Sequence, residues 1–373
     1  MLNYKYHNSV ARINFFHLYV FEMSFGQLPS ELVMRIGKDL QCVRDQSALM
    51  RTNRGIYFLL RRQLYKYDVD HQHRSGLIWA VQKQKISVAL YFLQLPGLNV
   101  NARDEDGRTL LHTACIENDG YYMTRILLHT SRIDLNAKDL LGRTPLSYLA
   151  SSGNLFSLDM LLQCPRIDVN AEDRKGQTPL HFAVQDGGKR AVKKLLADSR
   201  VNPNLLSMGE GYSPLTFSIF KGDLTILEIL LTDKRVDVNC TPDRGNPLTW
   251  SLLRRDENCA LRLLRAPMID INRSWPVGFS PLLLGVLSGF NSFVTELLKH
   301  DGVDINHQDD IGRTALMLAA EKGNFEALST LLDMDEIDVN LRDINRKCLL
   351  DYAANSYESR VLATVKRKLA DFS

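Results

Sequence analysis

The sequence predicts an all-α repeat array of about nine helix-turn-helix units with short β-hairpin turns, preceded by a small three-helix module. Two markers that share one period predict the array. A motif that in its fullest form reads Gly-Gln-Thr-Pro-Leu-His recurs, and its fourth position falls at residues 110, 145, 179, 214, 247, 281 and 315. An asparagine that closes an extended triplet recurs independently at residues 101, 136, 170, 204, 239, 272, 306 and 340.

The first 74 residues lie outside this period and divide into three segments. Residues 1–23 are expected to form a poorly ordered extension, and residues 69–74 a linker. Between them, residues 24–68 place Leu28, Leu32 and Ile36 four positions apart, which predicts one apolar face on a helix that begins near Pro29. Two more short helices fit the rest of this segment, so its core is small and some apolar surface is expected to remain for a partner.

The array is expected to run from residue 75 to residue 373, with atypical capping units at both ends. Within a unit, glycine supplies a turn with positive φ, Thr or Ser caps the next helix, and proline suits its first turn. Thr144-Pro145, Thr178-Pro179, Ser213-Pro214 and Ser280-Pro281 are therefore predicted helix starts. A second helix that carries a Leu-Leu pair closes each unit, as at Leu195-Leu196.

At these residues the sequence resembles the ankyrin-repeat family, whose signature includes Thr-Pro-Leu-His-x-Ala and alternates a β-turn with two helices. The resemblance covers about 300 residues and implies a solenoid that binds proteins and performs no chemistry. His112 and His181 match the family histidine. Ser147, Thr216, Thr249, Leu283 and Met317 stand in that slot elsewhere, which is expected to weaken local hydrogen bonding without threatening the fold.

Residues 24–68 resemble an F-box, as found ahead of ankyrin arrays in filamentous fungi. Leu28-Pro29 and Glu31-Leu32 match the opening LPxEL, and Ile36 continues the first helix. The resemblance implies docking onto the linker subunit of a Skp/cullin/F-box ubiquitin ligase through Leu28, Pro29, Leu32 and Ile36. The sequence departs from the pattern at Gln46, where a leucine is usual.

Composition and motifs exclude several function classes. The net charge is +3 from 46 basic and 43 acidic residues, so no overall field favours nucleic acid. The six cysteines have no C-x-x-C spacing, and no stretch of about 18 apolar residues suggests a membrane span. Phosphate-binding, metalloprotease, hydrolase and kinase signatures are absent from the sequence. We therefore expect no enzyme activity, no cofactor, no metal, no nucleic acid and no membrane partner.

Three sequence features carry both a functional and a structural interpretation. His71 and His73 form an HxH pair without a third ligand nearby, so a solvated linker is favoured over a metal site. His112 and His181 are expected to form structural hydrogen bonds rather than to catalyse. The aromatic residues Tyr148, Phe182, Phe217 and Trp250 share one slot in four first helices, where packing between repeats is favoured over ligand stacking.

Turn-tip residues are the predicted target-binding candidates, because fold requirements do not determine them. The run from Trp275 to Phe279 is unusually apolar for a hairpin, and Trp, Tyr and Arg are common interface anchors. An equal alternative is that Trp275 folds back on the neighbouring turn. The candidates are Leu141, Arg174, Lys175, Tyr212, Trp275, Phe279 and Ile311.

Two functions fit these predictions. In the first, the chain is the substrate-recruiting subunit of a Skp/cullin/F-box ubiquitin ligase, and its array holds the target. In the second, it is a plain ankyrin scaffold, and residues 24–68 only cap the first repeat. Burial of Leu28, Pro29, Leu32 and Ile36 against residues 75–101 would favour the scaffold. In both, the chain is expected to be a monomer by itself in the cytoplasm or nucleus.

Overall fold

The computed structural model describes residues 75–94, 98–117, 120–186, 188–209, 211–240 and 246–371. The predicted extension, the segment 24–68, the linker and the His71–His73 pair lie outside the described residues. The chain divides into two compact units, Met1–Asp134 and Leu135–Ser373. We call them unit 1 and unit 2 and describe each by itself.

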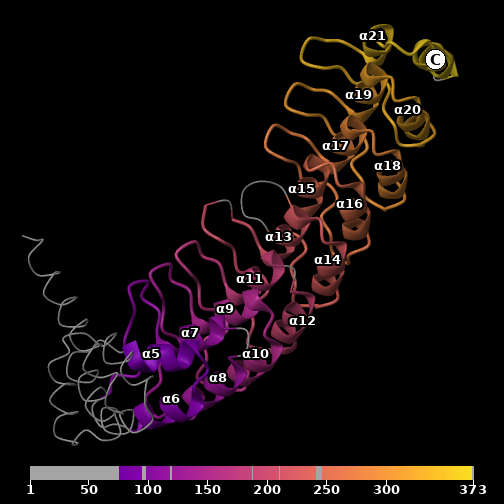
Figure 1. Ribbon diagram of the computed structural model, residues 1–373. Coiled ribbons are helices and arrows are strands. Elements are labelled where there is room, and N and C mark those ends of the chain that lie inside the picture. Colours follow the sequence, from indigo (N-terminus) through magenta and orange to yellow (C-terminus); the bar gives the residue numbers. More distant parts are fainter. Residues whose placement is uncertain are drawn as a thin grey trace, which may run out of the picture. The chain divides into compact units, whose positions relative to one another are not determined.

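The described part of unit 1 holds two helix pairs (Figure 1). In the first pair, α5 spans Ser75–Gln82 and α6 spans Ile86–Leu93. In the second, α7 spans Leu110–Ile116 and α8 spans Tyr121–Leu128. The helices of each pair pack against each other, and α5 also packs against α7. These are the weak first repeat and the first strong repeat of the predicted array.

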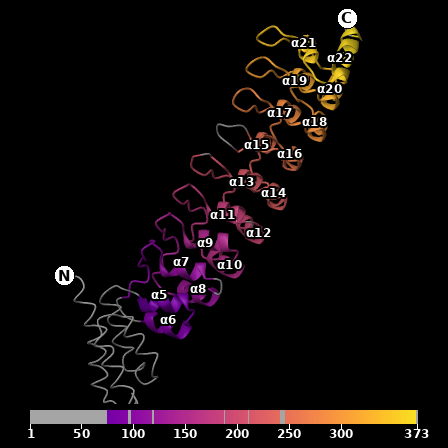
Figure 2. The same ribbon diagram turned by 45° about the horizontal axis from the view of Figure 1, so that its top comes forward.

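The described part of unit 2 is a stack of seven helix pairs. The first helices of the pairs form one row, and the second helices form the other (Figures 1 and 2). The first row is α9 Pro145–Ser152, α11 Pro179–Gln185, α13 Pro214–Lys221, α15 Pro247–Leu253, α17 Pro281–Ser288, α19 Ala315–Lys322 and α21 Leu349–Ala354. The second row is α10 Leu155–Leu162, α12 Lys189–Ala197, α14 Leu224–Leu231, α16 Glu257–Leu264, α18 Asn291–Leu297, α20 Phe325–Leu332 and α22 Ser359–Asp371.

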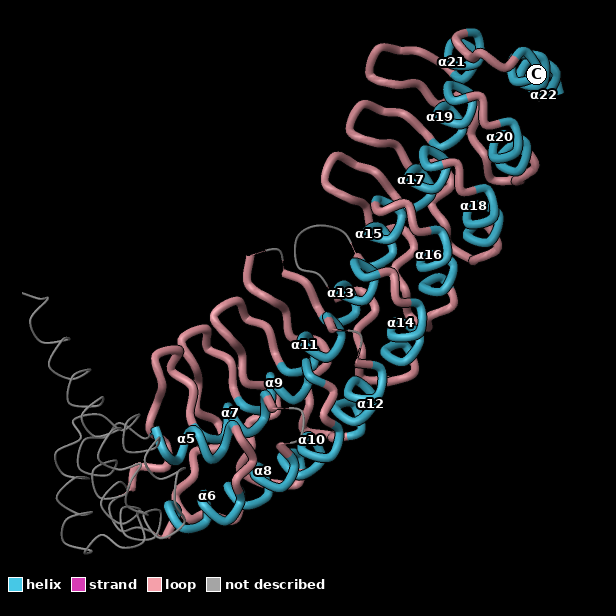
Figure 3. Tube along the Cα trace, viewed as in Figure 1, coloured by secondary structure: helices cyan, strands magenta, loops and turns pink. Residues whose placement is uncertain are grey.

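The described hairpin loops of unit 2 project from the side of the first row (Figure 3). They are tight turns between extended segments rather than regular strands. Among the described residues a single isolated bridge forms, between Trp275 and Phe279. The fold is therefore the predicted all-α solenoid, and within each unit every described helix pair packs on the next through both rows.

The predicted helix starts are confirmed, and their caps explain them. Pro145, Pro179, Pro214 and Pro281 are the first residues of α9, α11, α13 and α17. The Thr144 hydroxyl accepts a hydrogen bond from the Ser147 backbone N–H at 3.4 Å, and Gly153 ends α9 at φ +70°. A residue with a Cβ is strained at that φ, so glycine is favoured there.

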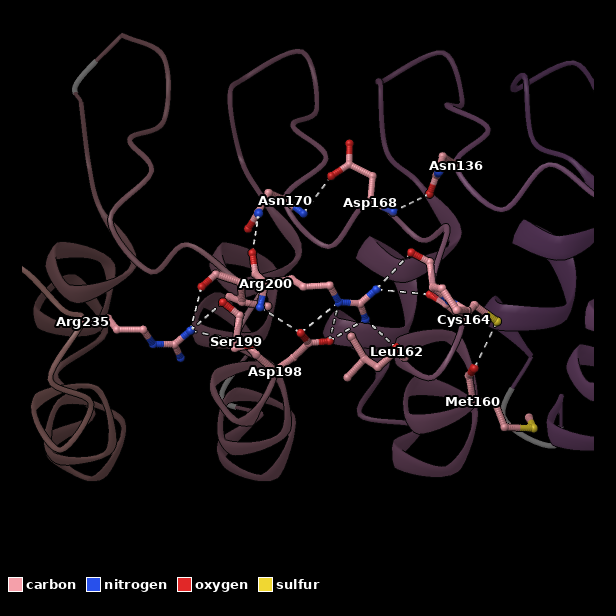
Figure 4. A network of polar contacts seen from close by, with 12 residues as sticks. Asn136, Met160, Leu162, Cys164, Asp168, Asn170, Asp198, Ser199, Arg200 and Arg235 are labelled. Carbon is pink, nitrogen blue, oxygen red and sulfur yellow. Dashed lines mark hydrogen bonds and ion pairs between the residues drawn. The ribbon is translucent and has the colours of Figure 1, made fainter.

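The periodic asparagine ties each repeat of unit 2 to the next. The Asn136 side chain donates to the Arg166 carbonyl at 2.9 Å. It accepts from the Asp168 N–H at 2.8 Å (Figure 4). The same pair of bonds recurs from Asn170, Asn204, Asn239, Asn272 and Asn306 to the repeat that follows each. An amide offers both a donor and an acceptor, whereas the carboxylate of an aspartate, which has the same shape, cannot donate.

Two arginines add a second link between consecutive repeats. The Arg200 guanidinium donates to the carbonyls of Leu162, at the end of α10, and Cys164, at 2.5 and 3.2 Å (Figure 4). Arg235 caps the end of α12 in the same way through the Leu196 carbonyl at 2.5 Å. A cation at the C-terminal end of a helix is favoured by the helix dipole. Hydrogen bonds to these guanidinium groups also hold the pKa of Asp198 and of Asp233 below its usual value.

Candidate protein-binding surface

The predicted target-binding residues all belong to unit 2, on the hairpin loops or at their bases. Leu141 and Ile311 lie at hairpin tips with 53% and 41% of their surface exposed. Arg174 and Lys175, at the next tip along, are exposed as well. Tyr212, Trp275 and Phe279 are half-buried. The structure therefore separates them into two groups, exposed tips and half-buried rings.

Most tips are shaped by an aspartate and a glycine. The Asp139 carboxylate accepts from the Leu141 and Arg143 backbone N–H groups, both at 2.8 Å. Asp173 and Asp309 do the same in their own hairpins. Gly142 takes φ +82°, and a Cβ there would lie 2.7 Å from the Arg174 nitrogen. The turn is thus fixed by short-range chemistry, which leaves the two tip residues free to vary.

Neighbouring tips are joined by backbone hydrogen bonds. The Leu141 carbonyl accepts from the Arg174 N–H at 2.9 Å. The Lys175 carbonyl accepts from Met208 at 2.7 Å, and the Ile311 carbonyl accepts from Ile344 at 3.0 Å. These bonds hold the tips at a fixed spacing, so a bound partner would meet a preorganised row.

The hairpin at 275–279 departs from this design. Trp275 occupies the slot of the turn aspartate, so the side-chain acceptor is lost. The turn is made by Pro276 and by Val277 at φ +85°, a strained value for a β-branched residue. Among the described residues, no hydrogen bond joins the Val277 carbonyl to the next hairpin tip. Strain of this kind concentrates at functional sites, which makes this hairpin the most distinctive tip of unit 2.

Five half-buried aromatic rings form a continuous cluster over three repeats. Tyr212 contacts Phe217, Phe220 and Trp250 with ring centroids 5.8, 4.7 and 5.5 Å apart. Trp250 also contacts Phe220 at 5.6 Å and Trp275 at 4.9 Å. The interpretation that Trp275 folds back on its neighbours therefore describes this structure. We call Tyr212, Phe217, Phe220, Trp250 and Trp275 the aromatic cluster.

The aromatic side chains in the shared slot of the first helices contact neighbouring repeats, as the packing interpretation predicts. Phe182 is 6% exposed, whereas Tyr148, Phe217 and Trp250 remain half-buried. The slot therefore packs repeats together and also contributes surface. Sequence reasoning missed Phe220 and the exposed Arg254, whose guanidinium lies 4.6 Å from the Phe220 ring centroid. The sequence feature that could have identified them is an aromatic residue and a cation at the ends of two consecutive first helices.

His181 fixes the base of the Tyr212 hairpin from inside the core. It is fully buried, and its Nδ1 accepts from the Thr178 backbone N–H at 3.1 Å. Its Nε2 lies 3.0 Å from the Tyr212 carbonyl, to which it donates in the matching tautomer. Burial lowers the pKa of His181 to about 4. The predicted structural role of this histidine is confirmed, and His112 likewise bonds Thr109 through Nδ1.

The described side chains also bear on metal binding, thiol reactivity and membrane insertion. No group of three or more His, Cys, Asp or Glu side chains there could hold a metal ion. Burial raises the pKa of the Cys115 and Cys259 thiols to about 12, which disfavours the reactive thiolate. No helix in the described ranges is long and apolar enough to cross a membrane.

The comparisons with known proteins agree with this architecture. The family model for ankyrin repeats (3 copies) matches residues 48–139, 125–207, 180–275 and 277–365. Its first range overlaps the end of the segment 24–68, while the LPxEL residues precede it.

Among solved structures, the ankyrin repeat domain of Bcl-3, a member of the IkappaB protein family, matches with a TM-score of 0.53. The two chains are 24% identical, and the match covers 60% of this chain and 99% of that one. No curated protein matches the chain. The chain therefore belongs to the ankyrin-repeat family, whose arrays are scaffolds for protein–protein interaction.

Proposed function

We propose that the chain recruits a protein target through the aromatic cluster and the hairpin tips of unit 2. The aromatic cluster carries this proposal, because its five rings contact one another and yet keep part of their surface open. Half-buried Trp and Tyr side chains supply large contact areas and lose little conformational entropy on binding. The backbone hydrogen bonds between neighbouring tips further reduce the conformational entropy that is lost on binding.

Trp275→Ala is expected to weaken target binding at least about tenfold, because it removes one ring of the cluster and its contact with Trp250. The measurement is quantitative co-purification of cellular proteins with the full chain. Phe156→Ala is the matched control, because Phe156 is 75% exposed on the second-row helix α10. A set of bound proteins that both variants retain equally would contradict the proposal.

We further propose that residues 24–68 dock the chain onto the linker subunit of a Skp/cullin/F-box ubiquitin ligase, so that the bound target is ubiquitinated. The motif Leu28-Pro29-x-Glu31-Leu32 supports this proposal. It precedes the ranges that match the ankyrin family model, so it needs no role in the array. The alternative is a plain ankyrin scaffold with no ligase link.

A Leu28→Ala/Pro29→Ala double variant is expected to lose binding of the purified linker subunit, which the wild-type chain retains. Loss of two apolar anchors from a small interface removes most of its hot-spot energy. The measurement is a pull-down with the full chain, and Trp275→Ala serves as the control that keeps residues 24–68 intact. If the wild type does not bind, or the double variant binds equally, the scaffold alternative stands.

A further inference from the structure

A small group of cations borders the aromatic cluster. Lys221 ends α13, and Arg254 and Arg255 follow the last residue of α15 directly. All three side chains are exposed. We call Lys221, Arg254 and Arg255 the basic edge. It comes from two consecutive first-row helices that pack against each other.

The basic edge has no ion pair with another described residue. The two aspartates that follow it in sequence cap second-row helices, and neither forms an ion pair with the three cations. Asp223 caps α14 and pairs with Lys189 at 3.6 Å, and Asp256 caps α16 through the Cys259 N–H at 3.0 Å. Three exposed cations without an ion-pair partner among the described residues contribute a local positive potential, which favours an external anion here.

The basic edge and the aromatic cluster are one continuous surface. The Arg254 guanidinium lies over the Phe220 ring at 4.6 Å, and Phe220 contacts Trp250 at 5.6 Å. Leu253, beside Arg254, is 40% exposed. A ligand that reaches the cations therefore also meets half-open rings and an aliphatic side chain.

We propose that this surface binds an extended acidic segment of a protein partner. Its carboxylates pair with the basic edge, and an adjacent apolar side chain packs on Phe220 and Trp250. The inference rests on the proposed function and adds the chemistry of the target. Arg254 is suited to the role, because a guanidinium stacked on a ring keeps its outward N–H groups available for a carboxylate.

A nucleic acid is the other polyanion that basic and aromatic residues together could attract. The charge of the array argues against it. Residues 76–373 carry 35 basic and 37 acidic residues, so no extended positive track follows a phosphate backbone. Three cations beside an apolar surface match a short acidic peptide better.

The test selects ligands for the full chain from a displayed library of short random peptides, with a single-stranded oligouridine as the nucleic-acid probe. The recovered peptides are synthesised with a fluorescent label, and their affinities are measured by anisotropy at low and raised salt. Four variants are compared, Arg254→Gln, Lys221→Gln, Trp250→Ala and the control Arg190→Gln. Arg190 is exposed on the second-row helix α12. Circular dichroism verifies folding of each variant, and Lys221→Gln provides a second charge variant.

The recovered peptides are expected to be rich in Asp and Glu and to bind more weakly at raised salt. Arg254→Gln should lower the affinity for these peptides about tenfold, because it removes a charge-assisted contact. Arg190→Gln should leave the affinity unchanged. The proposal is overturned if no peptide is recovered, if the peptides lack acidic residues, if Arg254→Gln has no effect, or if oligouridine binds instead. If Trp250→Ala weakens peptide binding and Arg254→Gln does not, the proposed preference for acidic segments is wrong, but the proposed function is not contradicted.

Discussion

Phe293→Ala is expected to lower the free energy of unfolding of unit 2 by about 3–5 kcal/mol, the usual cost of emptying a buried aromatic site. Phe293 is fully buried on α18 and faces Gly285 of α17. A Cβ at Gly285 would lie 2.8 Å from the Phe293 ring, so the two helices meet as closely as a glycine allows. Helices held this closely by their neighbours cannot collapse into the cavity that alanine leaves.

Equilibrium unfolding in urea, followed by far-ultraviolet circular dichroism, measures this loss. In a repeat array the effect should concentrate in the repeats next to α18, because each repeat contacts only its neighbours. Phe156→Ala is the control, since its exposed ring contributes little to the core. A loss below about 1 kcal/mol for Phe293→Ala would contradict the packing described between α17 and α18.

The helix boundaries could be predicted from sequence because their causes are local. Thr144, Pro145 and Gly153 act within one turn of the backbone that they shape. The role of the periodic asparagine could not be predicted in the same way. Asn136 bonds residues in the next repeat, and that partnership exists only once the repeats stack.

The candidate surface was predictable only in part for the same reason. The apolar hairpin that begins at Trp275 stands out in the sequence, and so does Tyr212 beside a turn glycine. The contacts of these residues with Phe220 and Trp250 depend on the distance between stacked repeats. The sequence of a single repeat does not determine that distance. The basic edge was missed because Lys221 and Arg254 are ordinary helix-end residues until their shared surface is visible.

The stability of unit 2 is expected to fall as the pH is lowered from 6.5 towards 4, and His181 is the cause. Its pKa in the folded chain is about 4, below the value of 6.5 expected when unfolded. Over that range the unfolded chain binds a proton that the folded chain does not. The free energy of unfolding therefore decreases by about 1.4 kcal/mol per pH unit, and by about 3 kcal/mol in total.

The geometry explains why the folded chain resists this proton. The Nδ1 lone pair is already used by the Thr178 backbone N–H, and the Nε2 proton by the Tyr212 carbonyl. Protonation would break the first bond and bury a charge beside the Phe217 ring, and the Asp173 carboxylate offsets this cost of burial only in part.

Urea unfolding at neutral pH and near pH 5 measures the effect, which should reach about 2 kcal/mol for the wild type. His181→Ser introduces the residue that the preceding repeat carries at this slot, Ser147. That variant should be less stable at neutral pH, because the Tyr212 carbonyl loses its donor, but it should lose much less stability on acidification. His300→Gln removes a half-buried imidazole elsewhere in unit 2 and is the matched control for the loss of a histidine. An equal acid-induced loss in wild type and His181→Ser would assign the pH dependence to other groups, since only the variant lacks the buried imidazole.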